Sequence, residues 1–172
     1  MLKGSLKDRC PACGVPAKMF EPYAEKVSEH RKMLLSLDIH PILVHFPVSF
    51  NVTILVLSAA SLILKGAALS SLEPALTVLV YFLPIAVIAA FLGGLFDGKV
   101  RFRKVTTPIL LRKIIYGSLF FLLAASMVMI NIIYGPVQEG LYFTLILSAG
   151  GVAVSTVLGK YGVSLLNAKF PG

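Results

Sequence analysis

The chain has 172 residues, of which 57% are hydrophobic and only 14% are charged. This composition excludes an ordinary soluble domain, in which about a quarter of the residues are charged. The formal net charge of +8 does not indicate a nucleic-acid partner, because six of the sixteen Lys and Arg residues lie in one segment, residues 97–113, between apolar stretches. Such a cluster is typical of a cytoplasmic loop in a membrane protein.

The polar leader, residues 1–38, carries one chemical motif, Cys10-Pro11-Ala12-Cys13-Gly14. Together with the residues that follow it as far as Glu21, this motif resembles the second metal knuckle of rubredoxin. The resemblance implies that both thiolates bind one iron. A closed tetrahedral site needs four ligands, so we expect two copies of the chain to share one iron or zinc ion.

Two other interpretations of the cysteines stay open: a redox-active dithiol, and a knuckle that holds no metal. A permanent disulfide is disfavoured by the expected cytoplasmic position. After the knuckle, apolar residues recur at helical spacing and predict a linking amphipathic helix over residues 22–39. His30 lies near the edge of its apolar stripe, and we interpret it as a partly packed surface histidine.

Four apolar stretches in the rest of the chain are long enough to cross a bilayer as helices. They cover residues 41–64, 75–96, 114–134 and 141–158. We therefore predict an all-α integral membrane protein, a four-helix transmembrane bundle. The expected domains are the knuckle over 1–21, the linking helix over 22–39, the transmembrane domain over 40–166 and a tail over 167–172.

The basic segment 97–113 sets the expected topology, because positively charged loops stay in the cytoplasm. Both termini are then cytoplasmic and the two short loops face outward. With spans of this kind, the protein is expected in the cytoplasmic membrane of a bacterium or an archaeon. Its expected partners are the lipid bilayer, a second copy of the chain and an electron-transfer partner, with no nucleic acid.

Prolines and small residues mark expected contacts between the spans. Pro47 and Pro84 each remove a backbone donor, which frees the carbonyls of Leu43 and Val80. A freed carbonyl is tolerated in a membrane only where another group or water satisfies it. We also expect Pro41 at the first position of its helix. Small residues that let another helix approach closely are Ala86, Ala90 and Gly94 in the second span and Gly151, Ser155 and Gly159 in the fourth.

The first span opens with His40-Pro41-Ile42-Leu43-Val44-His45-Phe46-Pro47. This stretch resembles the bacterial membrane family called domain of unknown function 2231, in which His-Pro-x-x-x-His-Phe-Pro opens the first membrane helix. Further likenesses are Gly93-Gly94-Leu95-Phe96-Asp97, Gly150-Gly151 and Lys160-Tyr161-Gly162-Val163, so that residues 38–166 are covered. The resemblance implies a fold and a site, and it does not imply an activity.

One departure from the family concerns the start of the third span. Many members carry a histidine there, whereas this chain reads Arg112-Lys113-Ile114-Ile115-Tyr116-Gly117.

The predicted topology gathers ionisable residues at the cytoplasmic rim of the bundle, where such groups are candidates for function. They are His40, His45, Asp97, Lys113 and Tyr116, followed by Lys160 and Tyr161. We expect His45 to lie within reach of Asp97, directly or through one water, or to bond the carbonyl freed by Pro47, which would lock the first two spans together. The alternative uses of the histidines are proton handling and metal or ligand binding.

Haem b ligation is a further alternative for the histidines. Axial ligands normally come from two helices, and His40 and His45 lie on one helix, about 140° apart around its axis. Only Met127 or Met129 could then supply the second ligand, although methionines in an apolar span usually serve packing.

The sequence thus favours an inner-membrane redox or electron-transfer protein, whose metal–thiolate knuckle exchanges electrons with a partner, a quinone or a haem near the rim. The alternative is a non-redox membrane component, either a small-solute or ion carrier or a zinc-stapled scaffold, that uses His40, His45 and Asp97. A classical enzyme is disfavoured, because the sequence shows no nucleophile–base pair and no phosphate loop.

Overall fold

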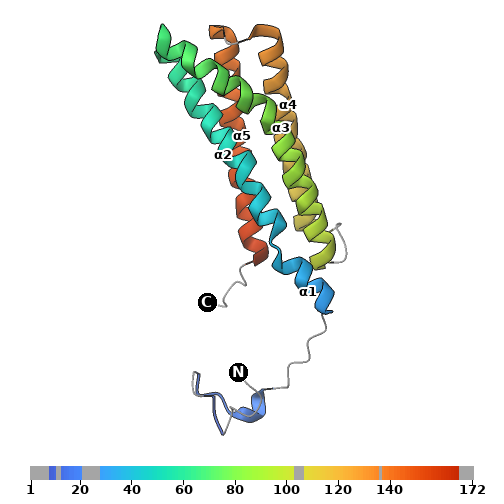
Figure 1. Cartoon of the computed structure of the whole chain (residues 1–172). Coiled ribbons are helices and arrows are strands. Elements are labelled where there is room, and N and C mark those ends of the chain that lie inside the picture. Colours follow the sequence, from blue (N-terminus) through green and yellow to red (C-terminus); the bar gives the residue numbers. More distant parts are fainter. Residues whose placement is uncertain (1–7, 11–12, 21–27, 103–106, 136, 167–172) are drawn as a thin grey trace. The chain divides into compact units, whose positions relative to one another are not determined.

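The computed structural model describes residues 8–10, 13–20, 28–102, 107–135 and 137–166, which form helices and no strand (Figure 1). The chain divides into two compact units, Met1–Lys32 and Met33–Gly172. The first unit contains both cysteines and the second contains the long helices. Part of the predicted linking helix, residues 21–27, and the predicted tail, 167–172, lie outside the described residues.

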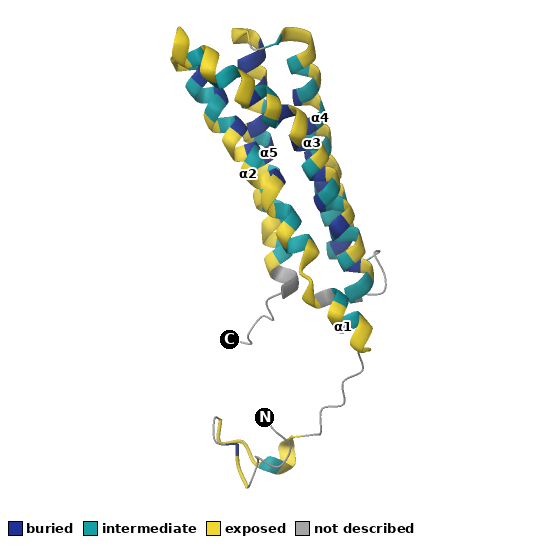
Figure 2. Ribbon diagram, viewed as in Figure 1, coloured by how far each residue is buried: buried dark blue, intermediate teal, exposed yellow. Residues whose placement is uncertain are grey.

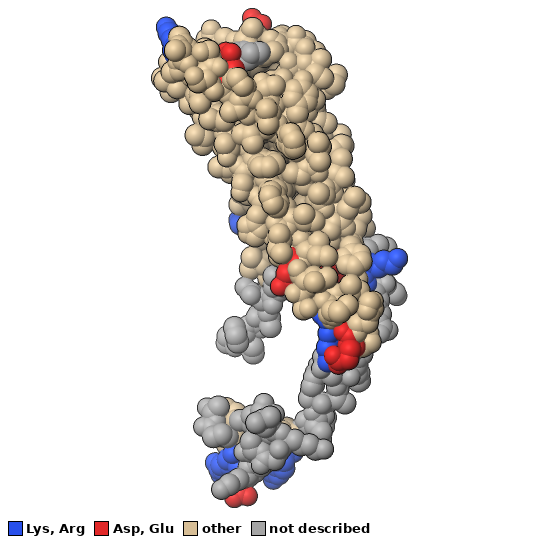
Figure 3. All heavy atoms as spheres, in the orientation of Figure 1, with Lys and Arg blue, Asp and Glu red and all other residues tan. Residues whose placement is uncertain are grey.

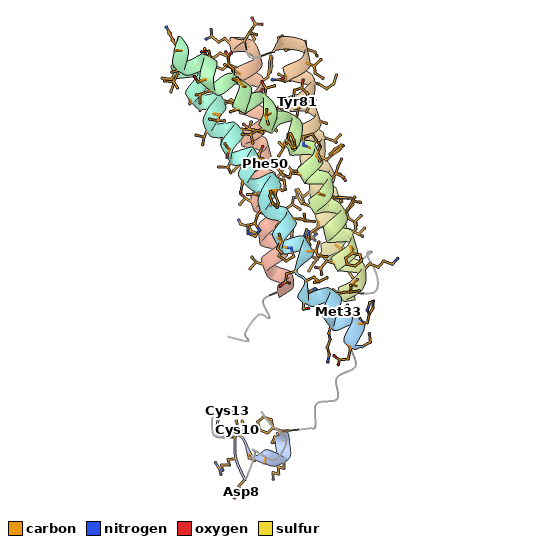
Figure 4. The ribbon with its side chains drawn as sticks, viewed as in Figure 1. Asp8, Cys10, Cys13, Met33, Phe50 and Tyr81 are labelled. Atoms are coloured by element: carbon orange, nitrogen blue, oxygen red, sulfur yellow. The ribbon has the colours of Figure 1, made fainter. Side chains whose placement is uncertain are left out.

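The first unit contains a tight loop around the two cysteines, labelled in Figure 4. The amide of Gly14 donates to the Cys10 carbonyl at 2.8 Å, and the Cys10 amide donates to the Val15 carbonyl at 2.9 Å. Gly14 has φ +72°, a left-handed conformation that glycine adopts without a steric cost. A short 3-10 helix, η1 (Ala17–Met19), follows, and its first amide donates to the Asp8 carbonyl at 2.9 Å. Backbone bonds therefore close the loop on both sides of the cysteines.

The helix α1 (Glu29–Ser36) forms part of the predicted linking helix, with an ion pair of 2.9 Å between Lys32 and Glu29 on its surface. The helix ends at Ser36, three residues before the end of the predicted linking segment. Asp38 has φ +46°, a left-handed conformation that breaks a right-handed helix and that Asp tolerates better than most residues. The next helix begins after this break.

The second unit is a bundle of α2 (Ile39–Ile63), α3 (Ala67–Phe102), α4 (Pro108–Tyr134) and α5 (Gln138–Leu166) (Figure 1). Each of the four is long and apolar enough to cross a membrane, which confirms the predicted four-span, all-α fold. Consecutive helices of the bundle pack against each other, and α5 closes the ring by packing against α2. The short connections make this an up-down-up-down bundle.

Buried residues in α2 recur at alternating steps of four and three, and those in α4 at steps of seven, three and four, as in coiled-coil packing. In α2 they are Pro47, Asn51, Ile54, Ser58 and Ser61. In α4 they are Leu110, Gly117, Phe120, Ala124 and Met127. Figure 2 shows that these buried positions face the inside of the bundle while the outside is exposed. The core is therefore one continuous seam along the bundle axis.

The outer surface of the bundle is apolar, as a lipid-facing surface must be. Ile63, Ile115 and Ile146 are each about two-thirds exposed or more, at 79%, 65% and 67%. Figure 3 shows charged side chains towards the ends of the bundle and a broad uncharged band between them. A soluble protein rarely exposes an apolar surface of this extent, so the chain is a multi-pass membrane protein.

The helices extend beyond the predicted spans, most of all α3, which has 36 residues. The predicted connection over residues 65–74 is mostly helix, and Gly66, with φ +62°, lies in the short turn between α2 and α3. The hydroxyls of Ser70 and Ser71 donate to the Ala67 carbonyl in the first turn of α3. Pro74 therefore lies inside the helix rather than before it.

The prolines inside the helices have different consequences. Figure 1 shows α3 changing direction near its middle, close to Tyr81 in Figure 4, where Pro84 removes the donor for the Val80 carbonyl. Pro47 lies buried within α2, which continues through it. Pro41 is the third residue of α2, whereas the sequence predicted it at the first position. Proline costs no hydrogen bond at the third position either, because the first four amides of a helix have no partner within the helix.

One polar side chain joins α2 to α5 in the middle of the core. Asn51 is fully buried and donates from Nδ2 to the Ser148 carbonyl at 3.0 Å. Its amide lies flat against Gly151, where an added Cβ would come within 2.8 Å of both Nδ2 and Oδ1. Gly151 from the second predicted small-residue stripe is thus a helix contact, whereas a Cβ added to Gly159 would meet nothing within 4 Å.

We predict that Gly151→Ala destabilises the bundle by about 1–3 kcal/mol, because the added methyl group must displace a buried, hydrogen-bonded amide. Gly159→Ala adds the same methyl group to the same helix without a neighbour, and is the matched control. The free energy of unfolding of both variants, measured in detergent micelles, should fall for the first and hold for the second. Equal effects would show that the Asn51 contact has no energetic importance.

Candidate functional site

The two predicted metal ligands lie on either side of one loop, and neither forms a disulfide (Figure 4). Cys10 is buried, with 5% of its surface exposed, whereas Cys13 is exposed. Within the described ranges, no group of three or more His, Cys, Asp or Glu residues could hold a metal ion. The donor set of one described loop is therefore two sulfurs, which suits iron or zinc in chemical type but makes only half of a tetrahedral site.

A second polar site lies in the bundle, where His40 of α2 meets α3 and α4. Its Nδ1 is 3.1 Å from the Ala90 carbonyl, and its Nε2 is 3.4 Å from Nζ of Lys113. A carbonyl only accepts and an ammonium only donates, so Nδ1 carries the proton and Nε2 accepts from Lys113. The imidazole is therefore neutral in this arrangement, and both of its nitrogens have partners.

Two glycines of α3 let α2 approach closely around this histidine. A Cβ added to Gly94 would lie 2.9 Å from Cε1 of the His40 ring, and one added to Gly93 would lie 2.9 Å from Cδ1 of Leu43. Both distances are shorter than real Cβ contacts allow. The predicted stripe of Ala86, Ala90 and Gly94 thus meets α2 at its last two members, Ala90 through its carbonyl and Gly94 through its missing side chain.

Asp97 supplies the negative charge of the site. Its electrostatic field acts on both His40 and Lys113, and its Oδ2 lies 3.8 Å from Nε of Arg101, one turn further along α3. Lys113 is half-buried beside these groups. A half-buried lysine beside a carboxylate and a neutral imidazole can exchange a proton or hold a small anion, two functions that suit a membrane rim.

His45 does not take the role that the sequence suggested. Its side chain is exposed, and its Nδ1 lies 2.6 Å from the Pro41 carbonyl of its own helix rather than near Asp97 or the Leu43 carbonyl. A direct hydrogen bond between His45 and Asp97 is therefore not found in the described part of the chain, and contact through one water stays a prediction. His40 lies seven residues before the buried Pro47, on the same inward face of α2, and extending the buried seam back by one heptad would have identified it.

The rim residues form two clusters rather than one. Tyr116 of α4 packs against Tyr161 of α5 with ring centroids 5.8 Å apart, and the Arg112 guanidinium lies 6.0 Å from the Tyr161 ring centroid. This cluster lies between α4 and α5, whereas His40 and Lys113 join α2 to α4. Sequence reasoning placed Tyr116 at the rim but did not identify Tyr161 as its neighbour, because the spacing within one helix does not reveal which helix lies opposite.

Several other predicted groups have clear positions. Met127 is fully buried in the bundle core, and Met129 is 56% exposed on the outer surface. Ser155 donates to the Val152 carbonyl of its own helix. Two of the basic residues used for the topology prediction, Arg103 and Lys104, lie outside the described residues.

No family model matches the chain, and no curated protein and no solved structure matches it.

We predict that His40→Ala lowers the free energy of unfolding by about 1–3 kcal/mol, because it leaves the half-buried Lys113 without its hydrogen-bond acceptor and removes the bond that Nδ1 makes to the Ala90 carbonyl. His45→Ala removes the same side chain from the same part of the helix and serves as the control. It should cost less than about 0.5 kcal/mol, because that ring is exposed. Unfolding of both variants in the same detergent checks this, and a larger loss for His45→Ala would contradict the assignment.

Proposed function

We propose that the protein is a redox protein of the cytoplasmic membrane, in which Cys10 and Cys13 of two chains hold one iron ion. The observation that supports this most directly is the loop around the cysteines. The Ala17 amide donates to the Asp8 carbonyl, and the Gly14 amide donates to the Cys10 carbonyl. These backbone hydrogen bonds hold the two thiols in one short turn. Thiolates are the ligands that iron and zinc prefer in closed tetrahedral sites.

Two arguments lead from this loop to a dimer. The loop supplies two sulfurs, and a two-fold axis supplies two more from an identical loop without further sequence. A two-sulfur site would leave the metal open to water and to competing thiols, whereas a shared site closes it. Metal binding would then stabilise the folded leader and the dimer together.

The proposed chemistry is one-electron transfer. Iron held by four thiolates supplies a ferric–ferrous couple, whereas zinc has no redox chemistry. The chain contributes the thiolates that hold the iron. Because Cys13 is exposed, its sulfur gives an electron a route from the iron to a partner protein or a carrier. The membrane helices tether this group to the bilayer, where membrane-bound electron carriers are found.

The likeness to the domain of unknown function 2231 family belongs to the same proposal. The position of His40 supports this likeness. His40 belongs to the motif that opens the first span, and it packs against Gly94, which belongs to the second motif that resembles the family. In this proposal the chain has both termini in the cytoplasm.

We predict that the full-length protein binds one iron per two chains and that Cys13→Ser abolishes binding and loosens the dimer. The bundle should stay folded, because the loop belongs to a separate compact unit. His45→Ala is the control, since it removes a potential metal ligand from outside the loop. Elemental analysis with detergent-corrected mass measures both quantities. Metal-free wild type, one metal per monomer, or metal retained by Cys13→Ser would each contradict the proposal.

The orientation has its own test with two exposed lysines at opposite ends of the bundle, Lys65 and Lys99. In a background with Cys10→Ser and Cys13→Ser, we expect a membrane-impermeant maleimide to label Lys65→Cys in intact cells. Lys99→Cys should be labelled only after permeabilisation, because the basic end faces the cytoplasm. Labelling in the opposite order would place the termini outside.

A second candidate function is a non-redox carrier of ions or small solutes with a zinc-stapled leader. The arrangement of His40, Lys113 and Asp97 favours it, because a half-buried lysine between three helices is costly and suits the transfer of a proton or an anion. Zinc in place of iron in the purified protein would favour this function over electron transfer. Proteoliposomes with wild type and Lys113→Gln would then test it by proton flux, which the variant should reduce.

A further inference from the structure

The outer seam between α4 and α5 carries a cation and aromatic rings at the end of the bundle with most basic residues. The Arg112 guanidinium lies 6.0 Å from the ring centroid of Tyr161, which itself packs against Tyr116 at 5.8 Å. Arg112 is exposed, and both tyrosines are half-buried. Tyrosine at this depth is typical of the membrane interface, where its ring is apolar and its hydroxyl meets the polar headgroups.

The charge on Arg112 has no acidic partner within the described ranges, whose ion pairs are Lys32–Glu29 and Arg101–Asp97. The neighbouring Lys113 turns into the bundle towards His40, so it does not share the seam with Arg112. The guanidinium is therefore held in place by an aromatic ring and keeps its donors for an external acceptor. Arginine binds phosphate oxygens with two parallel hydrogen bonds.

An apolar groove lies on the same two helices, further along the bundle, with a volume of about 490 Å³. Its walls are side chains of α4 and α5 only, with Leu122, Ser126 and Ile130 from α4 and Phe143 and Leu147 from α5 among them. The groove is open to the surrounding lipid.

The helical repeat connects the cation to the groove. Arg112, Leu119 and Ser126 are seven residues apart, so they follow one stripe along α4. On α5, Tyr161, Leu147 and Phe143 are separated by fourteen and eighteen residues, which returns them to one face at 3.6 residues per turn. From Arg112 to Leu122 the helix rises by about 15 Å, which is half of the roughly 30 Å hydrocarbon core.

We propose that this seam binds one anionic phospholipid. The phosphate accepts from Arg112 beside the Tyr116–Tyr161 pair, and one acyl chain runs along the stripe until it enters the groove at Leu122. Because the groove begins about 15 Å from Arg112, near the bilayer midplane, the acyl chain occupies it by extending past the midplane towards Ser126. A net negative headgroup is favoured over a zwitterionic one, because no acidic side chain of the described ranges pairs with Arg112 to compensate its charge.

The site is independent of the cysteines. It uses no residue of the leader, and it holds for a redox protein and for a carrier alike. An anionic lipid bound here would hold α4 against α5 at the end where the long basic segment joins α3 to α4.

The test uses the full-length protein in vesicles made of equal parts of phosphatidylglycerol and phosphatidylcholine with identical acyl chains. Native mass spectrometry after transfer to a mild detergent counts the lipids that stay bound to each chain. We expect wild type to retain phosphatidylglycerol about five-fold over phosphatidylcholine. This is the preference expected when a single cation, Arg112, distinguishes the two headgroups. Equal retention of the two lipids would overturn the proposal.

Two pairs of variants separate the site from general surface charge and from general apolar surface. Arg112→Gln should lose the preference, whereas Lys99→Gln, which removes one exposed cation from α3 at the same end, should keep it. Ser126→Phe fills the groove and should reduce the retention of both lipids, whereas Ala149→Phe on the exposed side of α5 should not. Circular dichroism and the unfolding midpoint confirm that each variant folds.

The remaining outcomes also decide the matter. If Lys99→Gln loses the preference as fully as Arg112→Gln, the binding is to diffuse surface charge and the site does not exist. If Ser126→Phe instead converts a dimer to a monomer, the occupant of the groove is a second copy of the chain. Either result would overturn the assignment of a lipid.

Discussion

The bundle depends on one constraint, that a polar group within the hydrocarbon region must find its partner inside the protein. The hydroxyls of Ser58 and Thr144 donate to carbonyls of their own helices at 2.7 and 2.8 Å. Asn51 instead donates from Nδ2 across to the Ser148 carbonyl of α5, while its Oδ1 has no hydrogen-bond partner in the described part of the chain. The same requirement gives His40 a partner on each of its two ring nitrogens. The Asn51 contact with α5 and the His40 contact with α3 both lie where two helices pack closely together.

Glycine decides where such close contacts are possible. Gly151 accommodates the Asn51 amide, and Gly94 accommodates the His40 ring, each at a distance that a Cβ would prevent. These two contacts tie α2 to α5 in the middle of the bundle and to α3 at its basic end. The leader unit with its cysteines is a separate compact body. The polar site around His40, Lys113 and Asp97 is built from residues of the bundle alone, whereas the metal–thiolate site that we propose uses residues of the leader.

The sequence is sufficient to predict the fold, because uncharged blocks of membrane-spanning length are rare outside membrane helices. Its small-residue stripes also identify Gly94 and Gly151 as contact positions. The helix ends are predicted less well, since α3 runs through Glu73 and Pro74, which resemble a loop in sequence.

The polar site is predicted in composition but not in detail. Proximity to Pro47 favours His45 in the sequence, whereas the inward face of α2 selects His40 in the structure. The pairing of Tyr116 with Tyr161 depends on which helices are neighbours, and a single sequence does not contain that information.

The central claim, that the cysteine loop carries a redox-active iron, is tested most directly by a redox titration of the purified full-length protein, followed by visible absorption. Ferric iron bound by thiolates absorbs visible light, and the ferrous form does not share that absorption. We expect a visible band that is lost on reduction, returns on reoxidation with a single one-electron transition, and is missing from Cys13→Ser. A colourless wild type, or a colour that does not respond to reduction, would contradict the account.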